Sequence, residues 1–324
     1  MLPKPPPREG PLGYLLLPPF RVQGTSVAGE ATCVQIPELD VCFDMGVCPR
    51  AALASKFAII SHGHMDHVGA LAYWCSQRNF QGMGPGRIVC DQRLAEPIRK
   101  MLGAFEEVEH SATPYEIIPL APEQEIQIKN NVIMRGFEVE HTCPAMGYSI
   151  IEKRSKLKPE YADLPQEKLR ELKDRDVEIT HVLDVPLVAY LGDTAPGAPL
   201  VRNDVRTAHI VISECTFIEP DHKQRAKIGK HLHLDDIVEW LGVLECEHLV
   251  LTHLSRRSNI ATARKQVEQL AGRERARRVH FLMDHRANRL RYEQQLASAE
   301  ALERKRLSQH PGTDEHAHQG PAHG

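Results

Sequence analysis

Short apolar runs, broken at close intervals by glycine and proline, fill the first half of the chain. Between residues 13 and 44 they predict strands joined by turns, and residues 115–152 return to the same strand-like pattern. Residues 57–60 are apolar without interruption, which is typical of a strand buried on both faces. Residues 71–74 and 92–105 are predicted to lie in helices. Strands and helices therefore alternate from the start.

The second half repeats this alternation. Apolar residues at positions 234, 237, 238 and 241 lie three or four residues apart, which predicts the buried face of a helix with two acids in its first turn. We expect further strands at residues 187–191, 210–212, 249–251 and 279–283, and a long polar helix at about residues 286–308. Interleaved strands and helices favour an α/β sandwich over a helical bundle.

Composition changes at both ends of the chain and once inside it. Residues 1–12 are rich in proline and are expected to be disordered, as is the tail at residues 308–324, which holds four histidines. Residues 13–307 form the predicted main domain. Within it, residues 152–181 are dense in charge and contain no glycine, so we expect an exposed insertion there.

The charge balance limits the kinds of partner that the protein is expected to bind. Lys and Arg number 40 and Asp and Glu 43, a formal net charge of −3, which argues against a general polyanion binder but not against a local basic patch. Two basic clusters stand out: Lys223, Arg225, Lys227 and Lys230, and Lys153, Arg154, Lys156 and Lys158. Either cluster fits phosphate contacts, and either fits an ordinary solvated surface.

Several absences lead us to expect a cytoplasmic protein without a membrane partner. No apolar run approaches the roughly 20 residues that span a bilayer, and the N-terminus lacks the apolar stretch of a secretion signal. The eight cysteines include no C-x-x-C pair. Buried reduced thiols are therefore expected instead of disulfides.

The strongest chemical signal is the hexapeptide His62-x-His64-x-Asp66-His67, which directly follows the predicted buried strand at residues 57–60. Imidazole and carboxylate side chains are ligands that zinc and related divalent ions prefer. A turn after a strand can point several side chains into one cleft. Four potential ligands within six residues therefore predict a metal site.

Three further candidate ligands stand where predicted strands end. His141 follows an alternating apolar run, Asp193 follows residues 187–191, and His253 follows residues 249–251. Each alone has an ordinary explanation, a packed histidine or a turn aspartate. In open α/β sheets, however, sites gather at the carboxyl ends of strands. With the hexapeptide they make seven ligands, which suit two ions about 3.5–4 Å apart that share a carboxylate.

With this ligand order the chain resembles the metallo-β-lactamase superfamily and, within it, the ribonuclease Z family of tRNA 3′-end processing endonucleases. The resemblance spans roughly residues 13–270. It implies an α/β fold of the αββα type, with two mixed β-sheets flanked by helices. The stretches that carry the resemblance are residues 43–46, 61–69, 192–194, 213–217, 230–234 and 252–257.

The resemblance also implies roles for individual residues. Seven would hold two zinc ions: His62, His64 and His141 the first, Asp66, His67 and His253 the second, and Asp193 both. Asp66 would also accept a proton from the attacking water, and Asp44 would steady the metal loop. His231 would protonate the leaving 3′ oxygen, with Glu214 orienting it.

Substrate and partners follow from the same resemblance. Precursor tRNA would be cut on the 3′ side of the discriminator base, leaving a 3′ hydroxyl. Independently of the resemblance, the basic run that begins at Lys223 supports contact with RNA, because it directly precedes His231. Ser255 and Arg257 are also expected to contact the RNA. The resemblance further implies a homodimer.

Two departures from the family pattern keep another function open. Members of the family often carry a long Gly/Pro-rich arm, whereas residues 152–181 are charged and contain no glycine, and Ser258 stands where an aromatic residue is common. A metallo-β-lactamase-fold hydrolase of a small phosphodiester or ester is therefore the alternative. A non-enzymatic RNA-binding protein is disfavoured, because such a protein has no chemical need for seven metal ligands.

Overall fold

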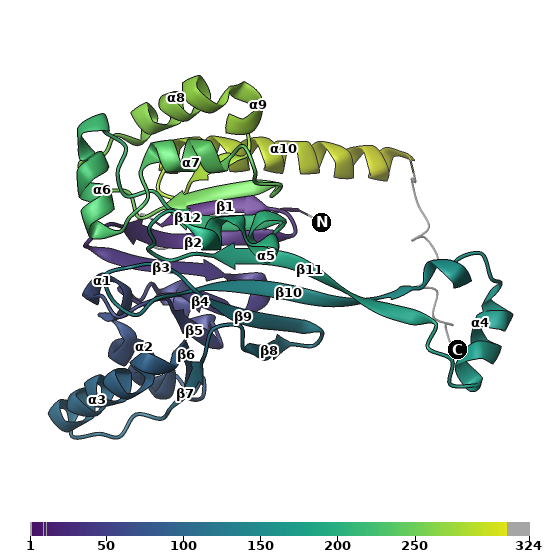
Figure 1. Cartoon of the computed structure of the whole chain (residues 1–324), viewed down its shortest axis with the longest axis horizontal. Helices are drawn as coiled ribbons and strands as arrows, with labels where there is room; N and C mark the ends of the chain where they lie inside the picture. Colours follow the sequence, from purple (N-terminus) through teal and green to yellow (C-terminus); the bar gives the residue numbers. More distant parts are fainter. Residues whose placement is uncertain (1, 9, 11, 310–324) are drawn as a thin grey trace, which may run out of the picture.

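Two mixed β-sheets, packed face to face with helices on their outer sides, form the body of the protein (Figure 1). The computed structural model describes residues 2–8, 10 and 12–309. Each sheet has seven strands, and apolar side chains from both sheets, such as Phe43 and Tyr148, share the main core. The predicted αββα sandwich is confirmed.

The first sheet holds its strands in chain order. They are β1 (Gly13–Leu17), β2 (Phe20–Val27), β3 (Ala31–Ile36), β4 (Val41–Phe43), β5 (Phe57–Ile60), β6 (Gly86–Asp91) and β7 (Tyr115–Leu120). β1 to β4 pair antiparallel, and β4 to β7 pair parallel. Because parallel strands end at the same edge, the loops after β4, β5 and β6 lie at one side of the sheet.

The second sheet repeats this plan. Its strands are β8 (Glu125–Lys129), β9 (Val132–Glu138), β10 (Met146–Leu157), β11 (Thr180–Tyr190), β12 (Ile210–Glu214), β13 (His248–Thr252) and β14 (Val279–Phe281). β8 to β11 pair antiparallel, and β11 to β14 pair parallel. The loops after β11, β12 and β13 therefore also share one edge.

Helices cover the outer face of each sheet. α2 (Leu71–Phe80) and α3 (Gln92–Glu109) bury apolar side chains such as Trp74 against the first sheet. α7 (Leu234–Trp240) and α8 (Ile260–Ala271) do the same for the second.

The other helices are α1 (Met65–Val68), α5 (Asn203–Arg206), α6 (Lys223–Gly229), α9 (Arg273–Ala276) and α10 (His285–Gln309). Short 3-10 turns are η1 (Pro37–Leu39), η2 (Arg50–Ala54), η3 (Pro159–Tyr161), η4 (Ala198–Val201) and η5 (Pro220–His222).

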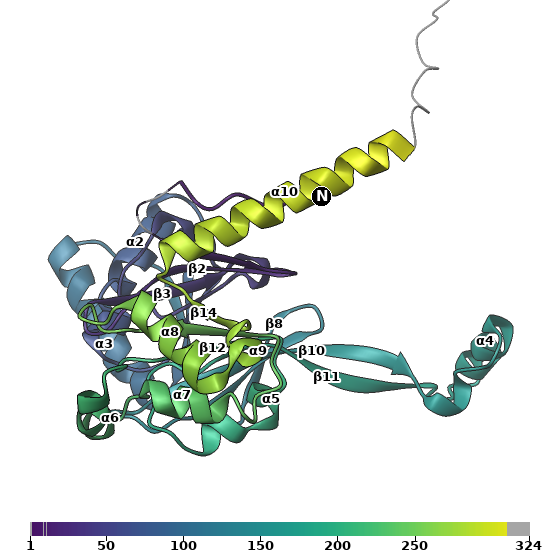
Figure 2. The same ribbon diagram turned by 90° about the horizontal axis from the view of Figure 1, so that it is seen from above.

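The long helix α10 packs against β1 and then runs past the body (Figure 2). The rings of Tyr14 and Tyr292 meet edge to face at 5.6 Å, and Gln295 donates a hydrogen bond to the carbonyl of Leu16. The hydroxyl of Tyr14 donates to the carbonyl of Lys4, so the Pro-rich start of the chain, although neither helix nor strand at residues 2–8, lies close to this helix. No helix among the described residues is long and apolar enough to cross a membrane.

Several element boundaries differ from the sequence-based expectation. α3 ends at Glu109 instead of residue 105, and β14 ends at Phe281 instead of residue 283. β11 begins at Thr180 instead of residue 187, because residues 180–184 pair with the end of β10 that extends beyond the core, where no apolar run marks them. α10 includes Ser308 and Gln309, which the sequence assigned to the tail. The rest of that tail, residues 310–324, lies outside the described residues.

An arm projects from the second sheet. β10 and β11 continue beyond the sandwich as a two-stranded ribbon, and α4 (Gln166–Asp174) lies at its tip (Figures 1 and 2). No residue of α4 is buried. The segment predicted as a charged insertion, residues 152–181, thus forms most of this arm.

Charges on the arm are balanced. Lys153 pairs with Asp184 at 3.0 Å and Lys158 with Glu178 at 3.5 Å. In both pairs the lysine lies on the outgoing segment of the arm and the acid on the returning segment. Residues 152–181 hold eight Lys or Arg and eight Asp or Glu. The basic cluster seen in the sequence is therefore largely neutralised by acids within the arm and its base.

Candidate metal centre

The seven candidate ligands meet at the edge where the two sheets are joined. Two isolated β-bridges connect the first sheet to loops of the second: His62, after β5, pairs with Ala145, and Val27, at the end of β2, pairs with Leu254. The hexapeptide follows β5, whereas His141 follows β9 and the other two ligands, Asp193 and His253, follow β11 and β13. The structure brings all seven together.

His62, His64 and His141 form the first group of ligand atoms. His64 Nδ1 lies 3.0 Å from His62 Nε2 and 3.3 Å from His141 Nε2. Nitrogen ligands 2.0–2.1 Å from a tetrahedral zinc ion are about 3.3 Å apart. The spacing of these three imidazoles therefore fits a single ion.

Asp66, His67 and His253 form the second group. His253 Nε2 lies 3.3 Å from His67 Nε2 and 3.2 Å from Asp66 Oδ2, and the remaining edge, from His67 Nε2 to Asp66 Oδ2, is 3.6 Å. These three distances again match the spacing of ligand atoms around a tetrahedral metal ion. The backbone N–H of Gly29 donates to Asp66 Oδ2 at 2.8 Å and fixes that carboxylate from outside.

Asp193 lies between the two groups. Its buried Oδ2 is 3.8 Å from His62 Nε2, 3.5 Å from His67 Nε2 and 3.4 Å from His253 Nε2. These distances are longer than ordinary hydrogen bonds, so the carboxylate oxygen and the three imidazole nitrogens lie around a common space. A buried carboxylate with imidazoles of both groups around it fits a shared ligand of two metal ions.

Electrostatics in this cluster favour metal binding. Burial, together with His67, lowers the pKa of His62 to about 2, and burial also lowers the pKa of His141. Both rings are therefore neutral near pH 7 and offer a lone pair. Burial raises the pKa of Asp193, but His253 and His67 outweigh it and hold that pKa well below its usual range. The carboxylate is thus ionised, as a metal ligand must be.

Asp44, directly after β4, supports the cluster from behind. It contacts His67 Nδ1 at 2.8 Å and accepts hydrogen bonds from the backbone of Ser61 at 2.7 Å and from the hydroxyl of Tyr190 at 2.6 Å. A carboxylate at Nδ1 requires the proton there, so a metal would bind at Nε2. Burial opposes protonation of His67, but Asp193 and Asp44 raise its pKa well above 6.5. Without a metal Nε2 therefore also carries a proton, which a bound ion would displace.

His231 stands beside the ligands and is held by Glu214. Its Nδ1 donates to Glu214 Oε1 at 2.9 Å, which leaves Nε2 free. Burial lowers the pKa of His231, but the hydrogen bond and charge of Glu214, with Asp193, raise it to about 9. His231 also lies near enough to His141 and Asp193 to be an alternative ligand with them.

Glu214 also reaches His253 through one hydroxyl. Thr216 Oγ1 donates to Glu214 Oε2 at 2.5 Å and accepts from His253 Nδ1 at 3.0 Å. The same buried carboxylate accepts the backbone N–H of Thr194 at 2.9 Å. Glu214 therefore fixes the ring orientation of both a candidate acid and a candidate ligand.

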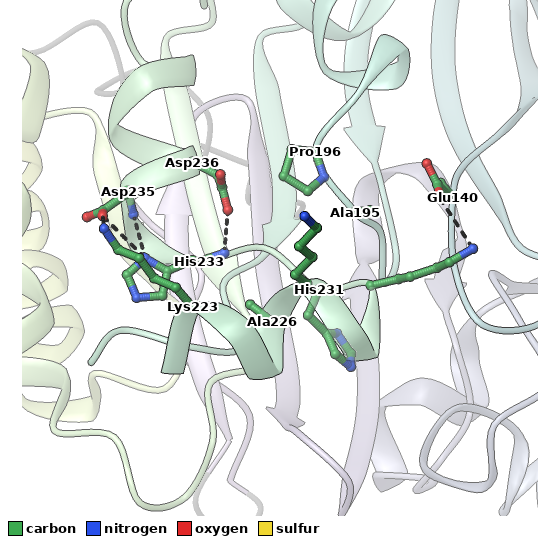
Figure 3. Close-up of a pocket in the computed structure, with 11 residues that line it drawn as sticks. Glu140, Ala195, Pro196, Lys223, Ala226, His231, His233, Asp235 and Asp236 are labelled. Atoms are coloured by element: carbon green, nitrogen blue, oxygen red, sulfur yellow. Dashed lines mark hydrogen bonds and ion pairs between the residues drawn. The ribbon is translucent and has the colours of Figure 1, made fainter. Parts of the chain in front are cut away.

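A cavity of about 520 Å³ opens on the other side of His231 (Figure 3). Its walls come from α6, from the start of α7, from the residue before the ligand His141 and from two residues shortly after Asp193. The lining residues are Glu140, Ala195, Pro196, Lys223, Ala226, Lys227, Lys230, His231, His233, Asp235 and Asp236.

The structure separates the basic run that begins at Lys223. Lys223 forms an ion pair with Asp235 (Figure 3), and Lys230 pairs with Glu140 at 3.3 Å. Arg225 lies over the ring of Phe217, 5.6 Å from its centroid, and does not line the cavity. Lys227 lines the cavity and has no ion-pair partner within the described part of the chain.

Two other predicted binding residues lie in the turn after β13. The backbone N–H of Ser255 donates to the carbonyl of Thr216, and Arg257 is exposed. Neither lines the cavity. His233, which does line the cavity, caps the N-terminus of α7 in a reciprocal arrangement with Asp236.

Sequence reasoning missed Thr216 and Tyr190 as supports of the metal cluster. Thr216 belongs to the stretch at residues 213–217 that carries the family resemblance, so a signal was present. Tyr190 reads as an ordinary apolar strand residue, and only its hydroxyl contact to Asp44 reveals a role.

Comparisons with known proteins agree with this site. The Beta-lactamase superfamily domain matches residues 49–254. The chloroplastic tRNase Z TRZ2 of Arabidopsis thaliana is 32% identical over 254 residues, which cover 78% of this chain and 72% of that protein. The tRNase Z TRZ1 of the same plant is 28% identical, with 78% of this chain and 91% of that protein covered.

Solved structures show the same fold at low identity. Human tRNase Z, short form, aligns with a TM-score of 0.53 at 16% identity and covers 83% of this chain and 95% of its own. The metallo-beta-lactamase fold protein YhfI of Bacillus subtilis aligns with a TM-score of 0.55 at 14% identity, with the same coverage. At these identities the two likenesses support the architecture alone.

Replacement of Gly46 by alanine tests how closely the metal loop is packed. A Cβ at this position would lie 1.7 Å from the carbonyl oxygen of Asp66, so the backbone that carries Asp66 and His67 must move. We expect Gly46→Ala to destabilise the protein by about 1–3 kcal/mol and to lower its metal content. Gly63→Ala, where the nearest atom is 3.5 Å away on Leu94, is the matched control. Thermal unfolding and elemental analysis check both, and equal behaviour of the two variants would contradict the close packing.

Proposed function

The chain belongs to the ribonuclease Z family of hydrolases within the beta-lactamase superfamily, and from this premise we propose that it is a zinc-dependent endoribonuclease that removes 3′ trailers from tRNA precursors. The observation that carries the proposal is the position of the His231–Glu214 pair, directly beside a cluster suited to two metal ions. A hydrolase that cuts an RNA backbone needs both a means of activating water and an acid for the leaving oxygen.

Two zinc ions fit the donor set, one in each group of three ligands with Asp193 shared. Such a pair of ions, when bound, makes water a nucleophile near neutral pH and stabilises negative charge on a phosphate. The protein itself orients the histidine ligands so that Nε2 would face the metal. Asp44 keeps the proton of His67 on Nδ1, and Thr216 does the same for His253.

Asp66 and His231 would move the protons. Burial raises the pKa of Asp66, but its hydrogen bond with His253 outweighs this and keeps the pKa below 3.8. The ionised carboxylate can take a proton from the attacking water. His231 would give a proton from Nε2 to the departing 3′ oxygen, because an alkoxide is a poor leaving group. Glu214, on Nδ1, supports the protonated ring.

Precursor tRNA is the proposed substrate. The relatives named tRNase Z and the cavity beside His231 support a strand of RNA at this site. Contacts from the run that begins at Lys223, from Ser255 and from Arg257 are part of the proposal.

A homodimer and a cytoplasmic location stay predictions. Light scattering after gel filtration checks the homodimer, and cell fractionation checks the location.

One observation favours the alternative, hydrolysis of a small phosphodiester or ester. The arm carries equal numbers of acidic and basic residues, so it has no net charge with which to attract a polyanion. Incubation of the purified protein with a precursor tRNA, with the cut mapped, separates the two functions from each other. A chromogenic phosphodiester cleaved without any cut at the tRNA 3′ end would support the alternative.

Removal of the shared carboxylate tests the two-ion assignment. The wild-type protein is expected to hold about two zinc ions per chain, and Asp193→Ala about one or fewer, because the carboxylate touches both positions. Asp174→Ala, on the arm, serves as the control and should keep the wild-type content. Elemental analysis after gel filtration measures this. Unchanged zinc in Asp193→Ala would rule out a shared ligand.

Replacement of His231 separates an acid from a ligand. His231→Ala is expected to keep its zinc and to cleave precursor tRNA roughly 100- to 10,000-fold more slowly. His222→Ala, in the turn before α6 and outside the cavity, is the control and should cleave normally. Single-turnover cleavage and elemental analysis are measured on the same samples. If His231→Ala loses zinc, His231 is a ligand and the acid lies elsewhere.

A further inference from the structure

We propose that the cavity beside His231 binds the nucleoside immediately upstream of the cut, the last nucleoside of the RNA that keeps the 3′ hydroxyl, and that Lys227 contacts the phosphate on its 5′ side. The inference rests on the proposed function. It adds which part of the substrate occupies the cavity and which residue recognises it.

The position of His231 gives the direction of the strand. His231 lines the cavity, and its ring also lies 5.1 Å from the ring of His141 and 5.6 Å from that of His253. No metal ligand lines the cavity. His231 thus stands between the ligand cluster and the cavity.

Phosphodiester hydrolysis that leaves a 3′ hydroxyl breaks the bond between phosphorus and the upstream O3′. Water supplies the new P–O bond and gives up a proton, and the departing O3′ takes one from His231. The phosphate therefore stays at the ligand cluster with the downstream strand, and the upstream ribose must lie next to His231. The space next to His231, away from the ligands, is the cavity.

The charges of the cavity suit a nucleoside better than a phosphate group. Three lysines and three acids line it, so their formal charges cancel. Two of the lysines are already paired, Lys223 with Asp235 and Lys230 with Glu140. Asp236 accepts the backbone N–H of His233 at 2.8 Å. A site whose lysines and carboxylates balance, with small apolar side chains beside them, fits the polar edges and flat faces of an uncharged ribose and base.

Lys227 is the exception in this set. It is exposed, lines the cavity and has no ion pair among the residues that the structure describes. A single lysine without an ion pair to any described residue, at the wall of a cavity whose other two lysines are paired, matches one phosphate. In a strand whose last nucleoside fills the cavity, the nearest phosphate outside the ligand cluster is the one on the 5′ side of that nucleoside.

Abasic substrates test the occupant of the cavity. Two precursor tRNAs are prepared, one without the base immediately upstream of the cut and one without the base immediately downstream. For wild-type protein we expect kcat/KM to fall roughly tenfold for the upstream change and little for the downstream one. A greater effect of the downstream change, or equal effects, would overturn the subsite.

Variants of Lys227 test the phosphate contact. Lys227→Met keeps the aliphatic stem and removes the charge, and should reduce the affinity for precursor tRNA roughly five- to tenfold, with the log–log salt slope reduced by about 0.7. Lys100→Met, an exposed lysine of α3, is the matched control and should match wild type in both quantities. Equal salt slopes for Lys227→Met and wild type would overturn the contact.

A wild-type protein that leaves every precursor tRNA intact would instead overturn the proposed function and the subsite together.

Discussion

Each group of metal ligands draws on both sheets, and this requirement governs the arrangement of the whole body. The loop after β5 in the first sheet supplies two ligands to each group, and a loop of the second sheet supplies the third, His141 in one case and His253 in the other. Asp193, also from the second sheet, lies between them. The cluster can form only if the two sheets meet at one edge in a fixed register, which the short bridges beside His62 and Leu254 secure.

The two sheets meet this requirement by the same plan. In each, the antiparallel strands lie at one end and the parallel strands at the other, and parallel strands direct their following loops to a common edge. Loops can then change in sequence without disturbing the core, which explains how catalytic and binding residues gather on one side. Buried carboxylates support one ligand from each sheet: Asp44 holds His67 of the first sheet, and Glu214, through Thr216, holds His253 of the second.

Much of this could be predicted from the sequence because the signals are local. The hexapeptide follows an apolar run, and strand ends alone located Asp193 and His253. What the sequence could not reveal depends on distant partners. Lys230 reads as part of a basic run, but it pairs with Glu140, which is far away in the chain. Thr180 reads as part of a charged insertion, but it begins a strand and pairs with Leu157 at the end of β10 that extends beyond the core. Hydrophobic periodicity reports burial, and neither feature is buried.

The ribbon of the arm gives this protein an adjustable reach. Its cross-strand pairs continue in regular order from Ile151 opposite Pro186 to Leu157 opposite Thr180, and α4 contributes no buried residue at its tip. Adding or removing one pair of residues lengthens or shortens the arm by about 3.3 Å and leaves the sandwich unchanged. The distance between the tip and the metal cluster is therefore set by a count of residue pairs, which can vary among related chains without any cost to the catalytic loops.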